Sequence, residues 1–157
     1  MDSQASHILL VEDNPDHVEL ILKAMGHTDF TDEIHVVGDG DKALDFLFQR
    51  GDYADAWRPC LILLDIKLPT VNGIEVLERI KADPNLRSIP VIMLTTSAGE
   101  QEIEKSYNFG ANSYVVKPVD FDQLVNAIQS LKEFWLVINS LPNARMQTSD
   151  EKISRKD

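Results

Sequence analysis

The stretch Leu61-Ile62-Leu63-Leu64-Asp65 decides the fold class of this chain. A short, unbroken apolar run bounded by turn residues is typical of a strand buried on both faces, as in a parallel sheet covered by helices. A charged residue directly after such a strand stands at its carboxyl end, where open α/β sheets bind their ligands. Asp65 is therefore either a solvent-facing carboxylate at a strand end or a functional group, and the surrounding sequence decides between the two.

The rest of the chain predicts four more strands and five helices around this strand. The strands are expected at residues 8–11, 34–37, 61–64, 91–94 and 114–116. Helices are expected to follow from Asn14-Pro15, Asp39-Gly40-Asp41, Asn72-Gly73, Glu100 and Asp120. Strands that alternate with helices predict a doubly wound, mostly parallel α/β sheet, and right-handed crossovers restrict its topology. The strand order 2-1-3-4-5 would place the first and third strands side by side.

The composition of the 157 residues fits one globular domain, with 43% apolar and 26% charged residues. A net charge of −11 argues against a nucleic-acid-binding surface, which needs clustered Lys and Arg. Cys60 is the single cysteine, so no disulfide can form within the chain. No segment reaches the roughly 18 apolar residues of a membrane helix, and residues 1–4 do not resemble a signal peptide. We expect a cytoplasmic protein that binds neither nucleic acid nor membrane.

Polar side chains follow several of the predicted strands. Glu12 and Asp13 come after the first strand, Asp65 after the third, Thr95 after the fourth and Lys117 after the fifth. Carboxylates packed together repel one another unless a cation offsets their charge, and Mg²⁺ accepts such oxygen ligands. Lys117 and a threonine hydroxyl could contact phosphate oxygens on the far side of Asp65. This set suits phosphoryl transfer, which depends on positioning and charge neutralisation.

Five ordered blocks of the sequence resemble the receiver domain of two-component response regulators, over about residues 6–132. The blocks are ILLVEDN (8–14), LILLDIKLP (61–69), Asn72-Gly73, IPVIMLTT (89–96) and GANSYVVKP (110–118). The resemblance implies a flavodoxin-like fold with a five-stranded parallel sheet in the order 2-1-3-4-5.

The same resemblance implies a phosphoacceptor and a metal site. Asp65 is implied to be the carboxylate nucleophile that receives a phosphoryl group from a histidine kinase. Asp13 is implied to bind Mg²⁺ directly, and Glu12 through a water molecule. The backbone carbonyl of Lys67 is implied to complete the metal site.

The resemblance also implies the residues that respond to phosphorylation. Lys117 is expected to pair with the phosphoryl oxygens and Thr95 to move toward them, followed by the aromatic ring of Tyr114. This movement would change the face formed by the helix at 100–109, the strand at 114–116 and the last helix. The Lys117-Pro118 peptide bond is expected to be cis. The protein would be a switch that phosphorylates itself and slowly dephosphorylates itself. It would not be an enzyme that turns over a substrate.

The end of the chain narrows the resemblance. Residues 129–142, which include Phe134-Trp135-Leu136, are similar to single-domain regulators paired with phytochrome-type photoreceptor kinases. We divide the chain into a receiver domain at 1–132, an apolar extension at 133–141 and a polar tail at 142–157 that we expect to be disordered. An exposed apolar segment usually marks an interface. A homodimer contact is therefore expected through the extension or through the face formed by the helix at 100–109, the strand at 114–116 and the last helix, which we call the response face. A phosphorelay intermediate and a phosphate sink both stay open.

Two other classes of protein share features of this fold. A flavin-binding electron carrier needs a Ser-, Thr- or Gly-rich loop after the first strand, whereas residues 12–16 read EDNPD and would repel a phosphate. A haloacid-dehalogenase-like phosphatase needs a second Asp two residues after its nucleophile, and position 67 is Lys. The four histidines show no metal-ligand spacing and are predicted to lie on the surface or in packing contacts: His7, His17, His27 and His35.

Overall fold

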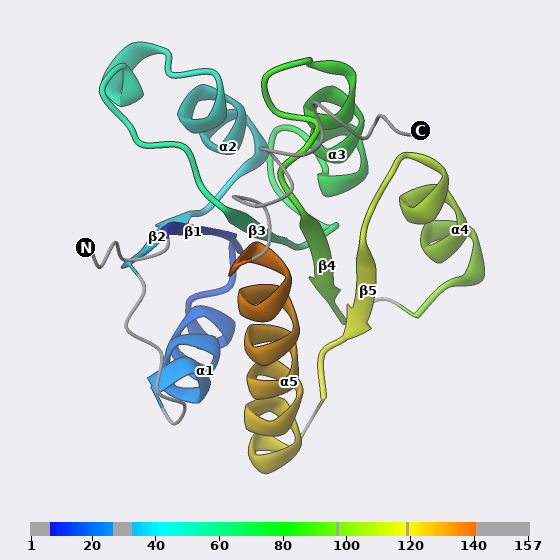
Figure 1. The fold of residues 1–157 in the computed structure, drawn as a ribbon. Coiled ribbons are helices and arrows are strands. Elements are labelled where there is room, and N and C mark those ends of the chain that lie inside the picture. Colours follow the sequence, from blue (N-terminus) through cyan, green and yellow to red (C-terminus); the bar gives the residue numbers. More distant parts are fainter. Residues whose placement is uncertain (1–6, 27–32, 97, 119, 141–157) are drawn as a thin grey trace, which may run out of the picture.

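The structure is a computed structural model that describes residues 7–26, 33–96, 98–118 and 120–140, with side chains as far as Leu131. Strands and helices alternate along the chain (Figure 1). The elements are β1 His7–Val11, α1 Pro15–Gly26, β2 Glu33–Val37, α2 Gly40–Leu47, η1 Gly51–Tyr53, β3 Leu61–Leu64, α3 Gly73–Ala82, β4 Val91–Thr95, α4 Glu100–Asn108, β5 Ser113–Val116 and α5 Phe121–Ser140. Among the described residues, no helix is both long and apolar enough to cross a membrane.

All five strands are parallel and lie in the order β2-β1-β3-β4-β5. The predicted topology is therefore confirmed. In the register of β1 and β3, Val11 pairs with Leu64. The residues that follow these two neighbouring strands consequently leave the sheet at the same level.

Helices cover both faces of the sheet (Figure 1). Alternate residues of β1 and β3 point to opposite faces, as strand geometry requires. Leu9 and Ile62 pack in one core cluster together with side chains of α2 and α3. Leu10 and Leu63 pack in a second cluster with side chains of α1 and α5. All four residues of β3 are buried, as the unbroken apolar run predicts.

The predicted starts of α1, α2 and α3 are confirmed by side-chain caps, which satisfy backbone N–H groups of the first turn. Asn14 Oδ1 accepts a hydrogen bond from the N–H of Asp16 at 2.9 Å and so caps α1. Asp39 Oδ1 caps α2 at 2.7 Å from the N–H of Lys42. Asn72 caps α3 in the same way, 3.0 Å from the N–H of Glu75.

The structure differs from the sequence-based expectations in two places. Helix α5 continues to Ser140, so the boundary placed after residue 132 falls inside a helix. No Gly or Pro stands between Phe121 and Ser140, and nothing in the sequence stops the helix earlier. The expected side-chain contact of residues 133–141 and the tail at 142–157 lie outside the described part of the chain. The described residues contain no cis peptide bond, so the expected cis Lys117-Pro118 bond is wrong. The bond is trans, which is the intrinsically favoured isomer.

Candidate functional site

Three carboxylates meet at the carboxyl ends of β1 and β3. Glu12 and Asp65 are buried, with 2% and 7% of their surface exposed, whereas Asp13 is exposed. One oxygen of each side chain lies within 4.8 Å of the others. The predicted convergence of Glu12, Asp13 and Asp65 is confirmed. Oxygen ligands at this spacing fit a hard divalent cation such as Mg²⁺, which also offsets their mutual repulsion.

The sheet fixes the two buried acids through their backbones. The N–H of Asp65 donates to Val11 O at 3.1 Å, and the N–H of Glu12 donates to Val37 O at 3.0 Å. Each acid therefore extends the hydrogen-bond ladder of its own strand by one residue. Their side chains inherit the positions of the strands, which the apolar core holds.

Lys117 brings a positive charge from β5 to this cluster. Its ammonium group donates to Glu12 Oε1 and lies 3.2 Å from Asp65 Oδ2. Only 7% of the lysine side chain is exposed. The N–H of Lys117 donates to Thr95 O at 2.7 Å, which fixes the end of β5 to the end of β4. The predicted placement of Lys117 beside Asp65 agrees with these contacts.

The charges of the cluster influence one another. Burial raises the pKa of Glu12, the hydrogen bond from Lys117 opposes this rise, and the neighbouring charge of Asp65 adds to it. One lysine offsets part of the charge of three acids. The acidic groups outnumber the basic one, and this excess would attract a divalent cation.

The loop after Asp65 brings the start of α3 into direct contact with the end of β3. Asp65 Oδ1 accepts a hydrogen bond from the N–H of Ile66 at 2.7 Å. The N–H of Gly73 donates to Ile66 O at 2.7 Å and closes the loop. A Cβ atom at Gly73 would lie 1.9 Å from the carbonyl oxygen of Asp65, so only glycine fits there. The start of α3 thus sits directly against the end of β3.

The same loop is also attached to the first turn of α2. Thr70 adopts a left-handed conformation with a φ of 66°, which is rare for a β-branched residue. Its hydroxyl oxygen accepts from the N–H of Asp41 at 3.0 Å, and the N–H of Gly40 donates to Pro69 O at 3.1 Å. The loop that carries Lys67 is therefore held at both ends.

The remaining predicted site residues are Thr95, Tyr114 and Lys67. Thr95 ends β4 with 1% of its surface exposed, at the same edge of the sheet as Asp65. Tyr114 lies in β5 beside Met93, and its partly buried ring packs against the core cluster of α2 and α3. The side chain of Lys67 is exposed.

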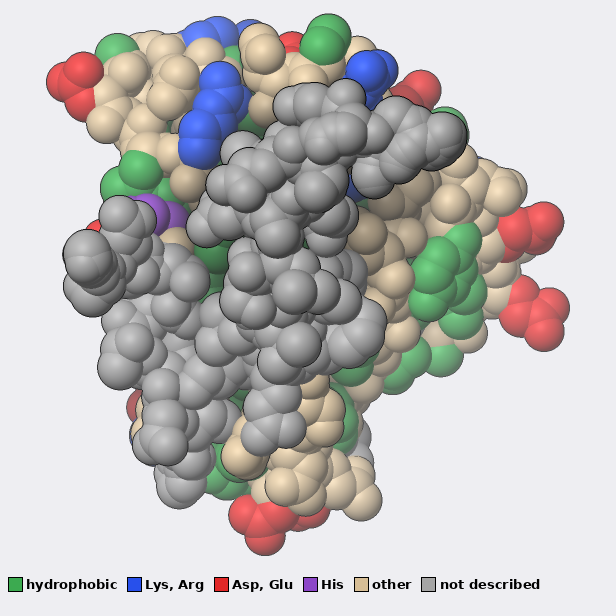
Figure 2. Space-filling view, viewed as in Figure 1, with side chains coloured by type: hydrophobic (Ala, Val, Ile, Leu, Met, Phe, Trp, Pro, Cys, Tyr) green, Lys and Arg blue, Asp and Glu red, His purple; other side chains and the backbone are tan. Residues whose placement is uncertain are grey.

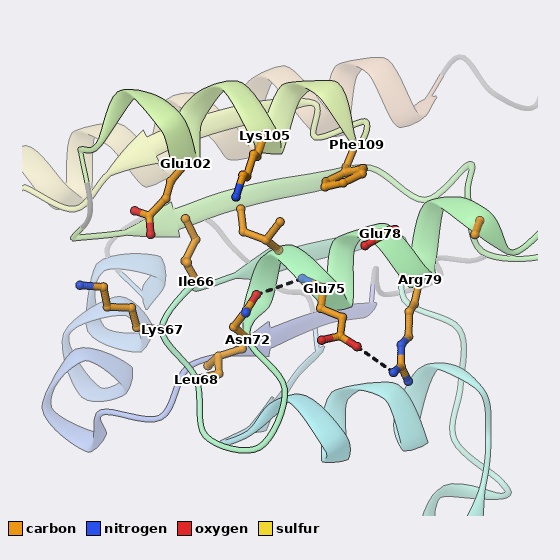
Figure 3. A pocket seen from close by; sticks show the side chains of 12 residues that line it. Ile66, Lys67, Leu68, Asn72, Glu75, Glu78, Arg79, Glu102, Lys105 and Phe109 are labelled. Carbon is orange, nitrogen blue, oxygen red and sulfur yellow. Dashed lines mark hydrogen bonds and ion pairs between the residues drawn. The ribbon is translucent and has the colours of Figure 1, made fainter.

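A groove of about 960 Å³ between α3 and α4 lies outside the acidic cluster (Figure 3). Its walls carry both charges, with Glu78 and Glu102 against Arg79 and Lys105. Arg79 already pairs with Glu75 of its own helix at 2.8 Å. This mixture of charges does not select one class of ligand, and the groove has none of the acid oxygens described above.

One site residue was missed by the sequence analysis. His17, predicted to be a surface or packing residue, lies with its Nδ1 atom 3.0 Å from Lys117 Nζ. Its place in the first turn of α1, four residues after Asp13, is the signal that could have found it. Helices in such sheets begin at the edge where ligands bind.

The family model described as the response regulator receiver domain matches residues 8–129. The probable methanogenesis regulatory protein FilR2 of Methanothrix harundinacea is 42% identical over 86% of each chain. The response regulator Rcp1 of Synechocystis sp. is 39% identical, over 87% of this chain and 93% of its own length.

Solved structures give the same result. The phosphorylated cyanobacterial phytochrome response regulator RcpA is similar with a TM-score of 0.81 and 43% identity, over 85% of this chain and 95% of that one. The Mn²⁺-bound form of Rcp1 is similar with a TM-score of 0.79 and 39% identity, over 83% of this chain and 94% of that one.

Proposed function

Because this chain belongs to the response regulator receiver domain family, we propose that it is a phosphoacceptor switch acting through Asp65. The observation that carries this proposal is the contact set of one buried carboxylate. Asp65 lies beside two further acids and 3.2 Å from the ammonium group of Lys117. The acid oxygens suit a divalent cation, and this cation and the ammonium group of Lys117 would together offset the negative charge of a phosphoryl group in transfer.

The proposed step transfers a phosphoryl group from a phosphohistidine of a kinase. An oxygen of Asp65 forms a bond to phosphorus while the phosphorus–nitrogen bond breaks, and the electron pair of that bond stays on the imidazole nitrogen. Lys117 stabilises the charge of the phosphoryl oxygens. A Mg²⁺ ion held by Glu12, Asp13, Asp65 and the carbonyl of Lys67 would neutralise charge between the acids and the phosphoryl group.

The proposed response follows from the added charge. Thr95 would move toward the phosphoryl oxygens and Tyr114 would change its place, altering the face formed by α4, β5 and α5. Tyr107 and Val116 belong to these elements and are 50% and 42% exposed. The output is a changed affinity for a partner or for a second copy of the chain, without turnover of a substrate.

The relatives support one class of kinase. RcpA, at 43% identity, is a phytochrome response regulator. A phytochrome-type photoreceptor kinase is therefore the proposed phosphoryl donor, and the chain would act as its final regulator, as a relay intermediate or as a phosphate sink.

The phosphoacceptor is tested by incubating the protein with Mg²⁺ and acetyl phosphate and measuring the phosphate adduct by intact mass spectrometry. The parent protein should be labelled, and Asp65→Asn should not. Asp55→Asn, which changes an exposed acid outside the site, is the matched control and should be labelled like the parent. Labelling of Asp65→Asn at the parent level would contradict the assignment.

A further inference from the structure

Lys117 has a third polar contact beyond the two buried acids. Its Nζ atom lies 3.0 Å from Nδ1 of His17. His17 stands in the first turn of α1, where its backbone N–H lies 3.4 Å from the capping oxygen of Asn14. About a third of the imidazole side chain is exposed, at 33%. The cap that starts α1 therefore also contacts the backbone of His17.

The chemistry of the two groups fixes the direction of the hydrogen bond. A lysine ammonium group can only donate, so Nδ1 of His17 accepts and the ring hydrogen is on Nε2. Nδ1 also lies 3.6 Å from Glu12 Oε2. With its lone pair directed at Lys117, Nδ1 has no hydrogen to donate to that carboxylate. The contact between His17 and Lys117 is therefore the hydrogen bond, and the one to Glu12 is only proximity.

The described residues offer the ammonium group three acceptors for its three N–H bonds. They are Glu12 Oε1, Asp65 Oδ2 and His17 Nδ1. Two of these acceptors belong to the acidic cluster that fits a divalent cation. The imidazole is the neutral acceptor of the three. A metal ion bound by the acids, or a phosphoryl group on Asp65, would leave the Nδ1 atom of His17 available to Lys117.

A cavity next to Lys117 makes this third acceptor important. The cavity has a volume of about 260 Å³, and its walls include His17, Thr96, Lys117 and Pro118. An ammonium group that loses its carboxylate partners could swing into this space. A flexible four-carbon side chain needs a fixed partner to stay at one place.

We propose that His17 is a positioning residue that holds the Lys117 ammonium group beside Asp65 while the carboxylates are engaged elsewhere. The proposal rests on the proposed function of Asp65 and Lys117. Without His17, a metal ion that takes the oxygens of Glu12 and Asp65 would leave the ammonium group with none of its three acceptors, so metal binding would cost more free energy. Loss of the acceptor therefore weakens metal binding although His17 itself binds no metal.

The variants separate hydrogen bonding from packing. His17→Leu keeps an apolar side chain of similar extent without an acceptor. His17→Asn keeps an acceptor, because its Oδ1 is bonded to Cγ as Nδ1 is in histidine. Glu19→Gln changes an exposed residue of the same helix and is the matched control.

The first measurement needs neither metal nor phosphate. The ammonium signal of Lys117 is followed by lysine-selective ¹H–¹⁵N NMR and identified by its absence in Lys117→Arg. Hydrogen bonds and burial slow exchange of these hydrogens with water, so the parent, His17→Asn and Glu19→Gln should show the signal. His17→Leu should lose it through faster exchange.

The second measurement is Mn²⁺ binding by titration calorimetry. His17→Leu should bind about tenfold more weakly than the parent, the lower end of the usual cost of losing one hydrogen bond to a charged group. His17→Asn should recover most of that loss. Parent-like signal and affinity in His17→Leu, or no recovery in His17→Asn, would overturn the proposal. An unlabelled parent in the acetyl phosphate experiment would contradict only the proposed function, because the NMR signal does not depend on phosphorylation.

Discussion

The centre and one edge of the sheet are built differently. At the centre, all four residues of β3 are buried and α3 buries Gly73, Val76, Leu77 and Ile80. At the edge, none of the residues of β5 is buried, and Ser106 is the one buried residue of α4, both elements being fully described. Acidic side chains stand out from the surface over α4 in Figure 2.

The difference in packing divides the site into two parts. One part lies on well-packed elements, and the other lies on elements that should open at a lower free energy. Asp65 and Glu12 come from the well-packed centre, whereas Lys117 and Tyr114 come from the edge. Elements with few buried apolar contacts open at a lower free energy than core elements. Under the proposed function, a charge added at Asp65 would therefore meet rigid neighbours on the side of the acids and more easily displaced elements on the side of Lys117.

The largest expected effect separates the two regions by their packing. Leu77→Ala in α3 should lower the free energy of unfolding by about 2–5 kcal/mol, because it leaves a cavity in the core. Ile103→Ala in α4 should cost about 1 kcal/mol, since Ile103 is only partly buried. Urea unfolding of the two variants measures both values. Equal costs would show that α4 is packed as firmly as α3.

The next effect tests the close contact between β3 and α3. Gly73→Ala should destabilise the protein by about 1–3 kcal/mol, because its Cβ atom would overlap the Asp65 carbonyl. Gly26→Ala at the end of α1 is the matched control, with no atom within 4 Å of the added Cβ. It should change stability by less than about 1 kcal/mol. Thermal or urea unfolding that does not distinguish the two variants would contradict the rigid attachment of α3.

A smaller effect is expected at the edge itself. Val116→Ser should change the free energy of unfolding by less than about 0.5 kcal/mol, because the side chain is already 42% exposed. It should nevertheless weaken self-association of the protein treated with beryllofluoride, a phosphate mimic, in light scattering. Leu22→Ser, at a residue of α1 with 38% exposure, is the control and should leave self-association unchanged. If both variants and the parent have the same molar mass after beryllofluoride treatment, the response face does not form the proposed interface.

The smallest effect concerns pH and the opposite edge of the sheet. Burial lowers the pKa of His35 on β2 below its usual 6.5, and its ring stacks on Phe46 at 4.7 Å. Above that usual value the residue is neutral in both the folded and the unfolded chain. As the pH falls below it, the unfolded chain takes up the proton more readily, so this contribution to stability is lost. His35→Phe keeps a stacked ring and should show a smaller loss of stability between about pH 7 and pH 5.5. An unchanged pH dependence would contradict the role of His35.

The sequence alone was sufficient for the centre of the molecule. The apolar runs before Glu12 and Asp65 identified two buried strands, and neighbouring parallel strands bring the groups at their ends together. The helix caps Asn14, Asp39 and Asn72 were equally visible, since their side chains act within three residues. Local patterns succeed where the determining contacts are local.

The sequence was insufficient where a contact joins residues far apart in the chain, and where no Gly or Pro marks the end of a helix. His17 lies 100 residues from Lys117, and its place in the first turn of α1 indicates nearness to the site without identifying Lys117 as its partner. The boundary between the receiver domain and the extension was placed at a change of composition after residue 132, although helix α5 continues to Ser140. The isomer of the Lys117-Pro118 bond was taken from the resemblance, and the structure has the other isomer.

The loop at Thr70 links the stability of two distant segments. A threonine rarely holds a left-handed conformation by its own preference. The loop depends on the N–H groups of Gly40 and Asp41, which become free to bond water whenever the first turn of α2 opens. Transient opening of α2 would then release the loop that carries the Lys67 carbonyl, so both segments would exchange their amide hydrogens as one cooperative unit. Hydrogen exchange should give Asp41 and Gly73 the same opening free energy, and two separate values would show that the segments open independently.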